Sequence, residues 1–366
     1  MKKTYNFSVG PQMLPEAVIE RAKEELFSYK RTGHSVMEIS RNTREFDELV
    51  RSARESLRRI LGVPQNYKIL FVPGGEESQY AAIPLNVLSS HKCADYIISG
   101  QHSKLASLEA KKYGDIVVAA TSAGANPPFS TVPETKRSSF RPDADYVYMC
   151  YNNSIYGTRF HYVPDTGNIP LVADMSCFLL SEPIDVSKYA LIYSSSEYCI
   201  GPTGMTIVIV RDDIVGDALA EAPSTLNYKI LSQNALTCPS VPVWCIYMAK
   251  LVFEWIESVG GLVEIKRRNE RKASLIYDYL DSQFYYTAPV DKKCRSMLNV
   301  VFVTGDANLD RKFAKEAKKA GFINLSGDNS VGGMRVSLYN AMSYEGVEEL
   351  VKFMKKFALE NPKIDT

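Results

Sequence analysis

The sequence is sparing in features that mark several classes of protein. Its 366 residues include only four histidines, so a metal centre built from histidine side chains is not expected. Lysine and arginine together number 43, and aspartate and glutamate 42, which leaves a formal net charge of +1. Without an excess of positive charge, the composition gives no support to a nucleic acid or an acidic membrane as a partner.

Long apolar runs and paired cysteines are also missing. No stretch of about 18 apolar residues occurs, so we expect no membrane-spanning helix. The two lysines that follow Met1 have no apolar run behind them, so we expect no secretory signal. The seven cysteines include no C-x-x-C pair and no zinc spacing; they lie at positions 93, 150, 177, 199, 238, 245 and 294. Such a scattered set predicts reduced, buried thiols in a cytoplasmic protein.

The composition is that of a globular protein, with 45% hydrophobic and 23% charged residues. A chain of this length corresponds to about two domains. Short apolar runs alternate with segments of helical periodicity, and the runs lie at 69–72, 96–98, 116–118, 146–149, 171–173, 191–193 and 207–210. This alternation predicts an α/β fold with a mostly parallel sheet, in which the first run is a buried parallel strand.

The pattern changes beyond about residue 240. Two long helical stretches come first, and strands then alternate with helices; the expected ranges are 243–259, 262–284, 298–303, 309–320, 334–338 and 344–357. This order predicts a smaller α+β domain at the C-terminal end of the chain.

Two short motifs could mark a ligand site, and each has a structural alternative. Gly74-Gly75 follows a strand and precedes a helix, where backbone N–H groups can hold an anion. Glu76 and Glu77 would repel a phosphate there by about 3 kcal/mol each at about 5 Å and an effective dielectric near 20, before screening. A plain turn is therefore favoured. Asp174 ends an apolar strand, where α/β sheets place ligands, but it could equally cap the segment that follows.

Three further features also admit a structural explanation. Arg335 opens an apolar strand, and a positive charge there needs an anionic ligand or a carboxylate partner. Gly201-Pro202-Thr203-Gly204 taken alone is typical of a structural turn. His102 and His161 have no acid at a diagnostic spacing, so each is expected to be a surface or internally satisfied histidine. On these grounds alone the sequence predicts a cytoplasmic α/β protein with a ligand crevice.

Longer stretches resemble the phosphoserine aminotransferases, a group of class V, fold-type I pyridoxal-phosphate aminotransferases. They extend over the whole chain, at 5–11 (YNFSVGP), 35–40 (SVMEIS), 82–86 (AIPLN), 153–158 (NSIYGT), 173–176 (ADMS), 201–204 (GPTG) and 332–342 (GGMRVSLYNAM). The resemblance implies a large domain with a mostly parallel seven-stranded sheet over residues 16–262. It also implies a small domain of residues 1–15 with 263–366, and a homodimer with two active sites at the subunit interface.

The resemblance fails at the position that matters most for the family's chemistry. The family's lysine, which holds the cofactor as a Schiff base a few residues before the Gly-Pro-x-Gly turn, is Tyr198 here. A phenol cannot form an imine, and it lacks the amine that shuttles the proton between the two halves of transamination.

Other positions of the family's site are changed as well. Several positions contact the cofactor or its phosphate in the family. In this sequence they are Gly75-Glu76-Glu77, His102 in place of a stacking ring, Glu197 in place of glutamine, and Pro239-Ser240 in place of Asn-Thr. The family's two His-Arg pairs, which bind the substrate phosphate, are Arg41-Asn42 and Asp328-Asn329. Three positions are kept: Asp174 for the pyridine nitrogen, Ser154 for the hydroxyl near the ring oxygen, and Arg335 for the substrate carboxylate.

Three hypotheses for function follow. The favoured one is a binding or regulatory protein that has lost normal transamination and binds pyridoxal phosphate weakly or not at all. The second is an enzyme of altered chemistry in the same crevice. The third is an active phosphoserine aminotransferase that uses another lysine, such as Lys104 or Lys250.

The charge of the crevice leaves two interpretations of Arg335 open. We expect it to pair internally with Glu76, Glu197 or Asp328, which would close the site. The alternative is a small ligand with one carboxylate and a cationic or neutral remainder, such as an amino acid.

Overall fold

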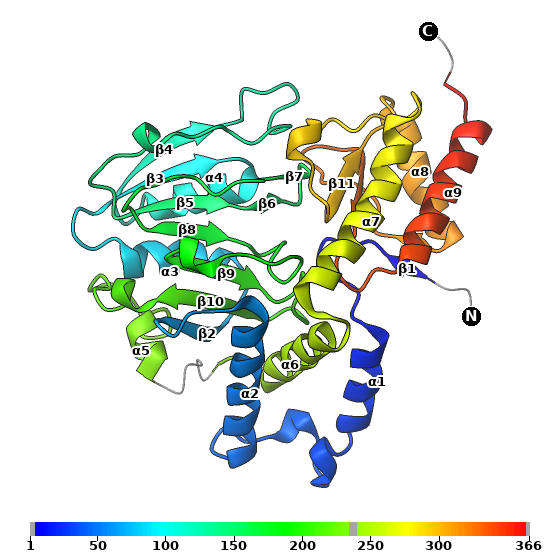
Figure 1. Cartoon of the computed structure of the whole chain (residues 1–366). Helices are drawn as coiled ribbons and strands as arrows, with labels where there is room; N and C mark the ends of the chain where they lie inside the picture. The colour runs from blue at the N-terminus through cyan, green and yellow to red at the C-terminus, as the bar shows by residue number, and fades with distance from the viewer. Residues whose placement is uncertain (1–3, 234–239, 364–366) are drawn as a thin grey trace.

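The computed structural model describes residues 4–233 and 240–363 of the chain. A seven-stranded sheet forms its centre, built from β2 (Tyr67–Pro73), β3 (Cys93–Ile98), β4 (Asp115–Thr121), β5 (Tyr146–Cys150), β8 (Leu171–Asp174), β9 (Leu191–Ser195) and β10 (Met205–Arg211). The spatial order is β2-β10-β9-β8-β5-β3-β4 (Figure 1). β10 is antiparallel to both of its neighbours and the other pairs are parallel, so the sheet is mostly parallel, as predicted.

The expected direction of the first strand is wrong in one respect. β2 is an edge strand of the described sheet, and its pairing with β10 is antiparallel, from Tyr67 opposite Arg211 to Pro73 opposite Met205. Its apolar residues are buried as the run indicated. A run of apolar residues arises because both faces of the strand are buried. The run therefore carries no information on the direction of the neighbouring strand.

The helices of this part of the chain are α1 (Glu16–Glu25), α2 (Arg44–Leu61), α3 (Glu77–Val87), α4 (Gln101–Ala110), α5 (Tyr228–Gln233) and α6 (Val243–Ser258). α2 shows why they form where they do. Thr43 Oγ1 accepts the backbone N–H of Phe46 at 3.4 Å, and Gly62 ends the helix with φ of 61°. An apolar stripe that begins at Phe46 packs against α6 (Figure 1).

The C-terminal part contains α7 (Gly261–Asp281), β11 (Asn299–Phe302), α8 (Ala307–Ala320), β12 (Phe322–Ile323), β13 (Met334–Ser337) and α9 (Tyr344–Glu360). β11 and β13 form an antiparallel pair. β1 (Tyr5–Asn6) crosses from the start of the chain to pair with β12, so the first residues lie beside the last elements (Figure 1). Two short strands, β6 (Asn152–Asn153) and β7 (Thr158–Arg159), form a hairpin after β5.

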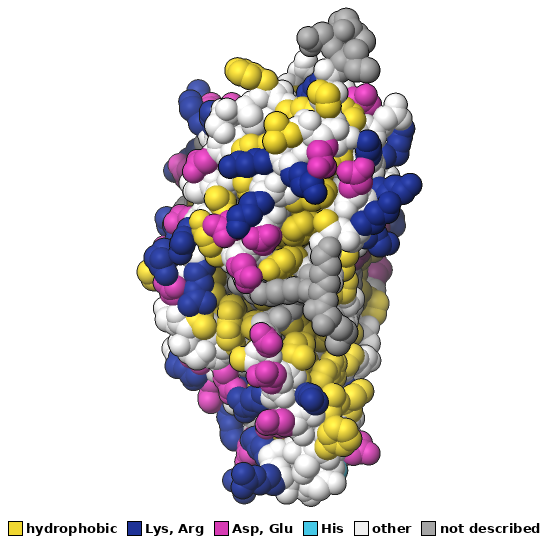
Figure 2. All heavy atoms as spheres, turned by 90° about the vertical axis from the view of Figure 1, so that its right-hand side faces the viewer, with side chains coloured by type: hydrophobic (Ala, Val, Ile, Leu, Met, Phe, Trp, Pro, Cys, Tyr) yellow, Lys and Arg dark blue, Asp and Glu magenta, His cyan; other side chains and the backbone are white. Residues whose placement is uncertain are grey.

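The distribution of surface charge and the burial of the cysteines agree with what the composition predicts. On the face seen in Figure 2, side chains of Lys and Arg are interspersed with those of Asp and Glu. Six cysteines are free and buried, as predicted, and Cys238 lies outside the described residues. Within the ranges 4–233 and 240–363, no helix is long and apolar enough to cross a membrane, and no group of three or more potential ligand side chains could hold a metal ion.

Phe313 is at the centre of an aromatic cluster in the C-terminal part. Its side chain is fully buried, and its ring centroid lies 5.1–5.9 Å from the rings of Tyr286, Phe302, Phe353 and Phe357. Replacing it leaves a cavity among rings that cannot all move inward. We expect Phe313→Ala to lower the free energy of unfolding by about 3–5 kcal/mol in urea titrations.

Phe284→Ala is the matched control, because that side chain is 99% exposed. Its free energy of unfolding should change by less than about 0.5 kcal/mol. Similar losses in both variants would contradict the assigned core.

Candidate functional site

Asp174 lies at the C-terminal end of β8, near the middle of the sheet. Cys150 of β5 and Tyr193 of β9 stand opposite it in the two neighbouring strands. Its Oδ1 accepts the backbone N–H of Ser176 at 2.9 Å, and the Tyr193 side chain also bonds to the carboxyl group. Burial raises the pKa of Asp174, and the nearby His102 and these hydrogen bonds oppose that rise. The site therefore contains a shielded carboxyl group at the edge where α/β sheets place ligands.

His102 lies in the first turn of α4, directly after β3. Its side chain is half-buried, and Nδ1 is 3.2 Å from the Tyr80 hydroxyl. The histidine is thus internally satisfied, which is one of the two alternatives expected from the sequence. His102 also opposes the rise in the pKa of Asp174 and contributes to the lowered pKa of Asp328.

Tyr198 and Glu76 form the central contact of the site. The Tyr198 hydroxyl donates to Glu76 Oε1 at 2.6 Å, although the two residues are 122 positions apart. Tyr198 is 5% exposed and Glu76 4%. Burial raises the pKa of the phenol well above its usual range, and the neighbouring Cys177 and Glu76 raise it further. The phenol is therefore a neutral hydrogen-bond donor that is committed to the carboxylate.

Two more carboxylates lie close to this pair. Burial raises the pKa of Glu197, and the charges of Glu76 and Glu77 add to that rise. Gly10 allows the N-terminal segment to pass close by, since a Cβ at Gly10 would stand 3.1 Å from Glu197 Oε1. A Cβ at Gly75 would stand 2.9 Å from Glu77 Oε2, so that carboxylate lies over the Gly75 backbone. The turn before α3 therefore places negative charge in the place where the sequence pattern allowed an anion.

Arg335 and Ser154 lie on the C-terminal side of this group. Arg335 Nη1 contacts the backbone oxygen of Ser154 at 3.5 Å, and the Ser154 side chain bonds to the Cys177 thiol. Cys177 in turn lies within electrostatic range of Glu76. Ser154 is therefore in contact with both Arg335 and Cys177.

The expected internal ion pair of Arg335 is wrong. Among the residues that the structure describes, Arg335 is within 4.0 Å of no carboxylate. Asp328 is held instead by Ser330, whose backbone N–H and hydroxyl reach its Oδ1 at 2.9 and 2.6 Å. These bonds, with smaller contributions from Arg335 and His102, lower the pKa of Asp328. Asp328 is thus engaged in its own loop, and within the described part of the chain Arg335 forms no ion pair.

The remaining predicted residues lie in other surroundings. Arg41 donates to the backbone oxygen of Val241 and stacks on the Phe46 ring at 5.4 Å. The exposed ones are Asn42, Ser240 and Asn329, and Pro239 lies outside the described residues. Of the two substitute lysines, Lys104 is exposed, whereas Lys250 is buried and pairs with Glu254 along α6. Neither lysine contacts the group around Asp174.

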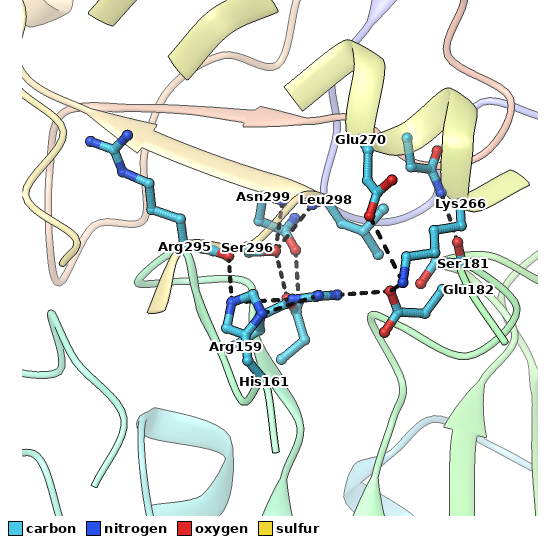
Figure 3. Close-up of polar contacts among 12 residues, drawn as sticks. Arg159, His161, Ser181, Glu182, Lys266, Glu270, Arg295, Ser296, Leu298 and Asn299 are labelled. Atoms are coloured by element: carbon cyan, nitrogen blue, oxygen red, sulfur yellow. Dashed lines mark hydrogen bonds and ion pairs between the residues drawn. The ribbon is translucent and has the colours of Figure 1, made fainter. Parts of the chain in front are cut away.

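A second polar cluster, which sequence reasoning missed, joins the sheet region to α7 (Figure 3). The side chains of Arg159 from β7 and Lys266 from α7 both point at Glu182, at 3.3 and 3.5 Å from its Oε2. Arg159 and Glu182 are buried. His161 is exposed and lies against Arg159, with Nδ1 3.2 Å from Nη2. No spacing in the sequence indicates this cluster, since its members come from three separate segments.

The residues around Asp174 fit a pyridoxal phosphate only in part. Asp174 suits a ring nitrogen, because a buried carboxyl group can share a proton with it. Where the resemblance expects the family's lysine, the chain has the phenol of Tyr198, and the turn at Gly75 presents Glu77 where a phosphate would need donors. As arranged here, the site does not fit the phosphorylated, covalently held cofactor.

Comparison with known proteins gives the same fold a family context. The class V aminotransferase family matches residues 4–350. A phosphoserine aminotransferase from Bacillus cereus is 42% identical and covers 99% of this chain and 100% of its own length. The structure of the phosphoserine aminotransferase from Bacillus circulans subsp. alkalophilus superposes with a TM-score of 0.93 at 39% identity, covering 98% and 99% of the two chains. A phosphoserine aminotransferase from Trichomonas vaginalis, solved with pyridoxal phosphate bound, gives 0.90 at 34% identity, covering 96% and 100%. The fold is therefore that of the fold-type I aminotransferases.

Tyr198→Phe tests the central hydrogen bond. The change removes the donor to Glu76 and leaves a buried carboxylate oxygen without it. We expect the free energy of unfolding to fall by about 1–3 kcal/mol, measured by urea denaturation. Tyr113→Phe is a matched control, because Tyr113 donates to Glu109 at 3.4 Å near the surface, and we expect it to change little. Equal effects of the two substitutions would contradict the assigned contact.

Asp174→Asn tests the raised pKa of Asp174. Because burial raises that pKa, the folded chain holds the proton more tightly than the unfolded chain does. The contribution to stability is then complete below the ordinary pKa of about 3.9 and is lost as pH rises through the raised value. Asparagine avoids this loss and keeps an acceptor for the Ser176 N–H. We expect the variant to be more stable than the unchanged chain at about pH 7.5, with the difference vanishing near pH 3.

Asp165→Asn is the control for this pH series. Asp165 is exposed and makes the same kind of contact, with Gly167 N–H at 3.0 Å. Its substitution should give no pH-dependent gain. A flat difference between Asp174→Asn and the unchanged chain across this range would show that the carboxyl group titrates normally.

Proposed function

The chain belongs to the class V aminotransferase family, and we propose that it is a non-transaminating member of the phosphoserine aminotransferase group. In this proposal it keeps the scaffold and binds a small carboxylate or amino acid in a binding or regulatory role. The single observation that carries the proposal is the buried hydrogen bond from Tyr198 to Glu76 at 2.6 Å. The side chain at the position of the family's lysine is engaged with an acid and has no amine.

Two parts of transamination depend on that lysine. An amine forms the covalent bond to an aldehyde cofactor, and it also carries the proton between carbon atoms in the two half-reactions. Pyridoxal phosphate supplies the electron-withdrawing ring for this chemistry in the family. In this chain the Tyr198 phenol replaces the amine, and burial together with Cys177 and Glu76 holds its proton in place. Neither part is therefore supported at position 198.

Weak binding of pyridoxal phosphate is part of the same proposal. Glu76, Glu77 and Glu197 bring negative charge to the side of the sheet where the family's phosphate is bound. A phosphate dianion would meet repulsion from each, in addition to losing the covalent bond. Asp174 and Ser154 keep the family's positions beside the cofactor's ring, but these two contacts do not compensate for these losses.

The comparisons taken alone favour a second candidate, an active phosphoserine aminotransferase. Relatives about 42% identical over almost the whole chain carry that name. This candidate needs an amine from elsewhere in the molecule. Lys272 is a buried lysine whose pKa is lowered to about 7, chiefly by burial, but its Nζ donates to the backbone oxygens of Leu338 and Tyr339 at 2.7 Å.

The assembly follows the family in our proposal. We propose a cytoplasmic homodimer in which each chain has a large domain, 16–262, and a small domain, 1–15 with 263–366. The parallel pairing of β1 with β12 supports the assignment of the N-terminal segment to the C-terminal part. Dimerisation would bring the exposed Asn42 and Ser240 close to a second chain, as the family's arrangement implies.

Incubation with pyridoxal phosphate followed by borohydride tests the proposed function. We expect no reducible visible band, no covalent adduct in intact-mass spectra and no glutamate-dependent amino transfer. Tyr198→Lys alone should not restore transfer, because the acids near the phosphate position remain.

The Bacillus circulans relative, treated identically, is the positive control. A stoichiometric adduct on the unchanged chain, mapped to any lysine, would favour the active enzyme. Its peptide map would also identify the substitute amine.

A further inference from the structure

A pocket of about 390 Å³ opens between α6, α7 and the segment that leads into α9. α7 packs beside α9 in the C-terminal part (Figure 1). The pocket is lined by Trp255, Glu264, four basic residues of α7 and residues 340–344, none of which belongs to the group around Asp174. Its volume lies in the range of about 300–1,000 Å³ that is typical of small-molecule sites. It is therefore a candidate site separate from the crevice.

α7 presents four basic side chains to this pocket, namely Arg267, Arg268, Arg271 and Lys272. Residues three and four positions apart lie on the same face of a helix, so these like charges repel one another. Glu264 is the only acid among the described residues that line the pocket, and it pairs with Arg267 and Arg268 at 2.7 Å each. One carboxylate thus serves two guanidinium groups, and an excess of positive charge remains.

Arg271 is oriented by an aromatic ring and not by an acid. Its guanidinium carbon lies 4.0 Å from the centroid of the Tyr344 ring, and within the ranges that the structure describes it forms no ion pair. A guanidinium stacked in this way keeps the N–H donors of its own plane available to a further partner. Tyr344 is the first residue of α9, a helix of 17 residues, so Arg271 stands where the helix dipole also favours negative charge.

Lys272 provides a second, independent indication of an anion. It is 1% exposed, and its Nζ donates to the backbone oxygens of Leu338 and Tyr339 at 2.7 Å. These acceptors are uncharged, and no carboxylate of the described chain forms an ion pair with Lys272. Burial lowers its pKa to about 7, and the charge of Arg268 also acts to lower it. A buried ammonium without a counter-charge is unfavourable, and an anion in the adjoining pocket would stabilise it.

The pocket also has an apolar surface. Trp255 of α6 is half-buried and Met342 is buried, and both line the same space as the basic residues. An indole ring offers a flat surface on which an organic ring can stack. A phosphate group carries up to two negative charges and three strong acceptor oxygens, so it can engage several separate donors at once. These properties match the excess charge and the spread of donors better than a single carboxylate does.

We propose that this pocket binds a phosphate group, either free or carried by a compound with a flat organic part, such as a nucleoside monophosphate. The phosphate meets Arg268, Arg271 and the first turn of α9, and an organic part packs on Trp255. The inference goes beyond the proposed function, because it concerns a site outside the crevice. It holds whether or not the crevice transaminates.

The test is calorimetric titration of the full chain with inorganic phosphate, adenosine monophosphate and adenosine. We expect saturable binding of phosphate-bearing ligand, weakened by added salt because the attraction is screened. Adenosine should bind at least about tenfold more weakly than its monophosphate. Tighter binding of the monophosphate than of inorganic phosphate would identify a phosphate ester as the ligand, and equal affinities would identify free phosphate.

Arg268→Gln and Arg271→Gln locate the phosphate. Both side chains are exposed, so the fold should be kept, and each change should weaken binding of the tighter phosphate ligand by about tenfold. Arg311→Gln is the matched control, because Arg311 is an exposed arginine of α8 that does not line the pocket; binding should be unchanged.

Tryptophan fluorescence gives an independent location. The chain has two tryptophans, so Trp244→Phe leaves Trp255 as the only one. Binding of the tighter phosphate ligand to this variant should change its emission, because the ligand packs beside the indole ring.

Two results would overturn the inference. One is the absence of saturable binding of both phosphate-bearing ligands at millimolar concentration by a folded chain. The other is binding that neither arginine variant of α7 weakens, which would place the phosphate elsewhere; its loss in Arg335→Gln would place it in the crevice. The adduct and amino-transfer assays decide the proposed function separately, so either proposal can fail alone.

Discussion

The hydrogen-bonded alignment of the central strands is the constraint on which the rest of the site depends. β5, β8 and β9 run parallel, so Cys150, Asp174 and Tyr193 are brought to one line at the sheet edge. The segments that follow these strands must then turn over the same edge. Tyr198 follows β9 and Glu76 follows β2, which are held in register through β10. Their contact at 2.6 Å is a product of this ladder.

Much of the fold could be predicted from the sequence, and for clear physical reasons. Apolar runs are buried strands because both faces of the sheet are covered, as in β5 and β8. The stripe and caps of α2 determine that helix locally. The direction of β2 could not be predicted, because its residues are buried equally in a parallel and in an antiparallel pairing. β1 and β12 were missed because two residues each carry no periodic signal.

The candidate site was predicted less completely than the fold. The position of Asp174 follows from the strand that it ends, and the phenol at Tyr198 is visible by resemblance. Whether Tyr198 contacts Glu76, and whether an acid contacts Arg335, depends on the directions of side chains from distant parts of the chain. Tyr198 and Glu76 are 122 positions apart in the sequence. The partner of Asp328 is local, since Ser330 satisfies that carboxylate within its own turn. Local hydrogen bonds of this kind compete with long-range ion pairs and are not apparent from charge alone.

The Tyr198–Glu76 pair also restricts the order in which such a site can change over evolutionary time. A lysine arriving at position 198 would stand beside the Glu76 carboxylate and be held as its ammonium, and a protonated amine is no nucleophile. A small or apolar residue arriving first at position 76 would leave the phenol without its acceptor. Each single step away from the pair is thus unfavourable in its own way, and the two positions must change together. The hydrogen bond therefore couples the two positions, so a substitution at either one is expected to be tolerated only with a matching change at the other.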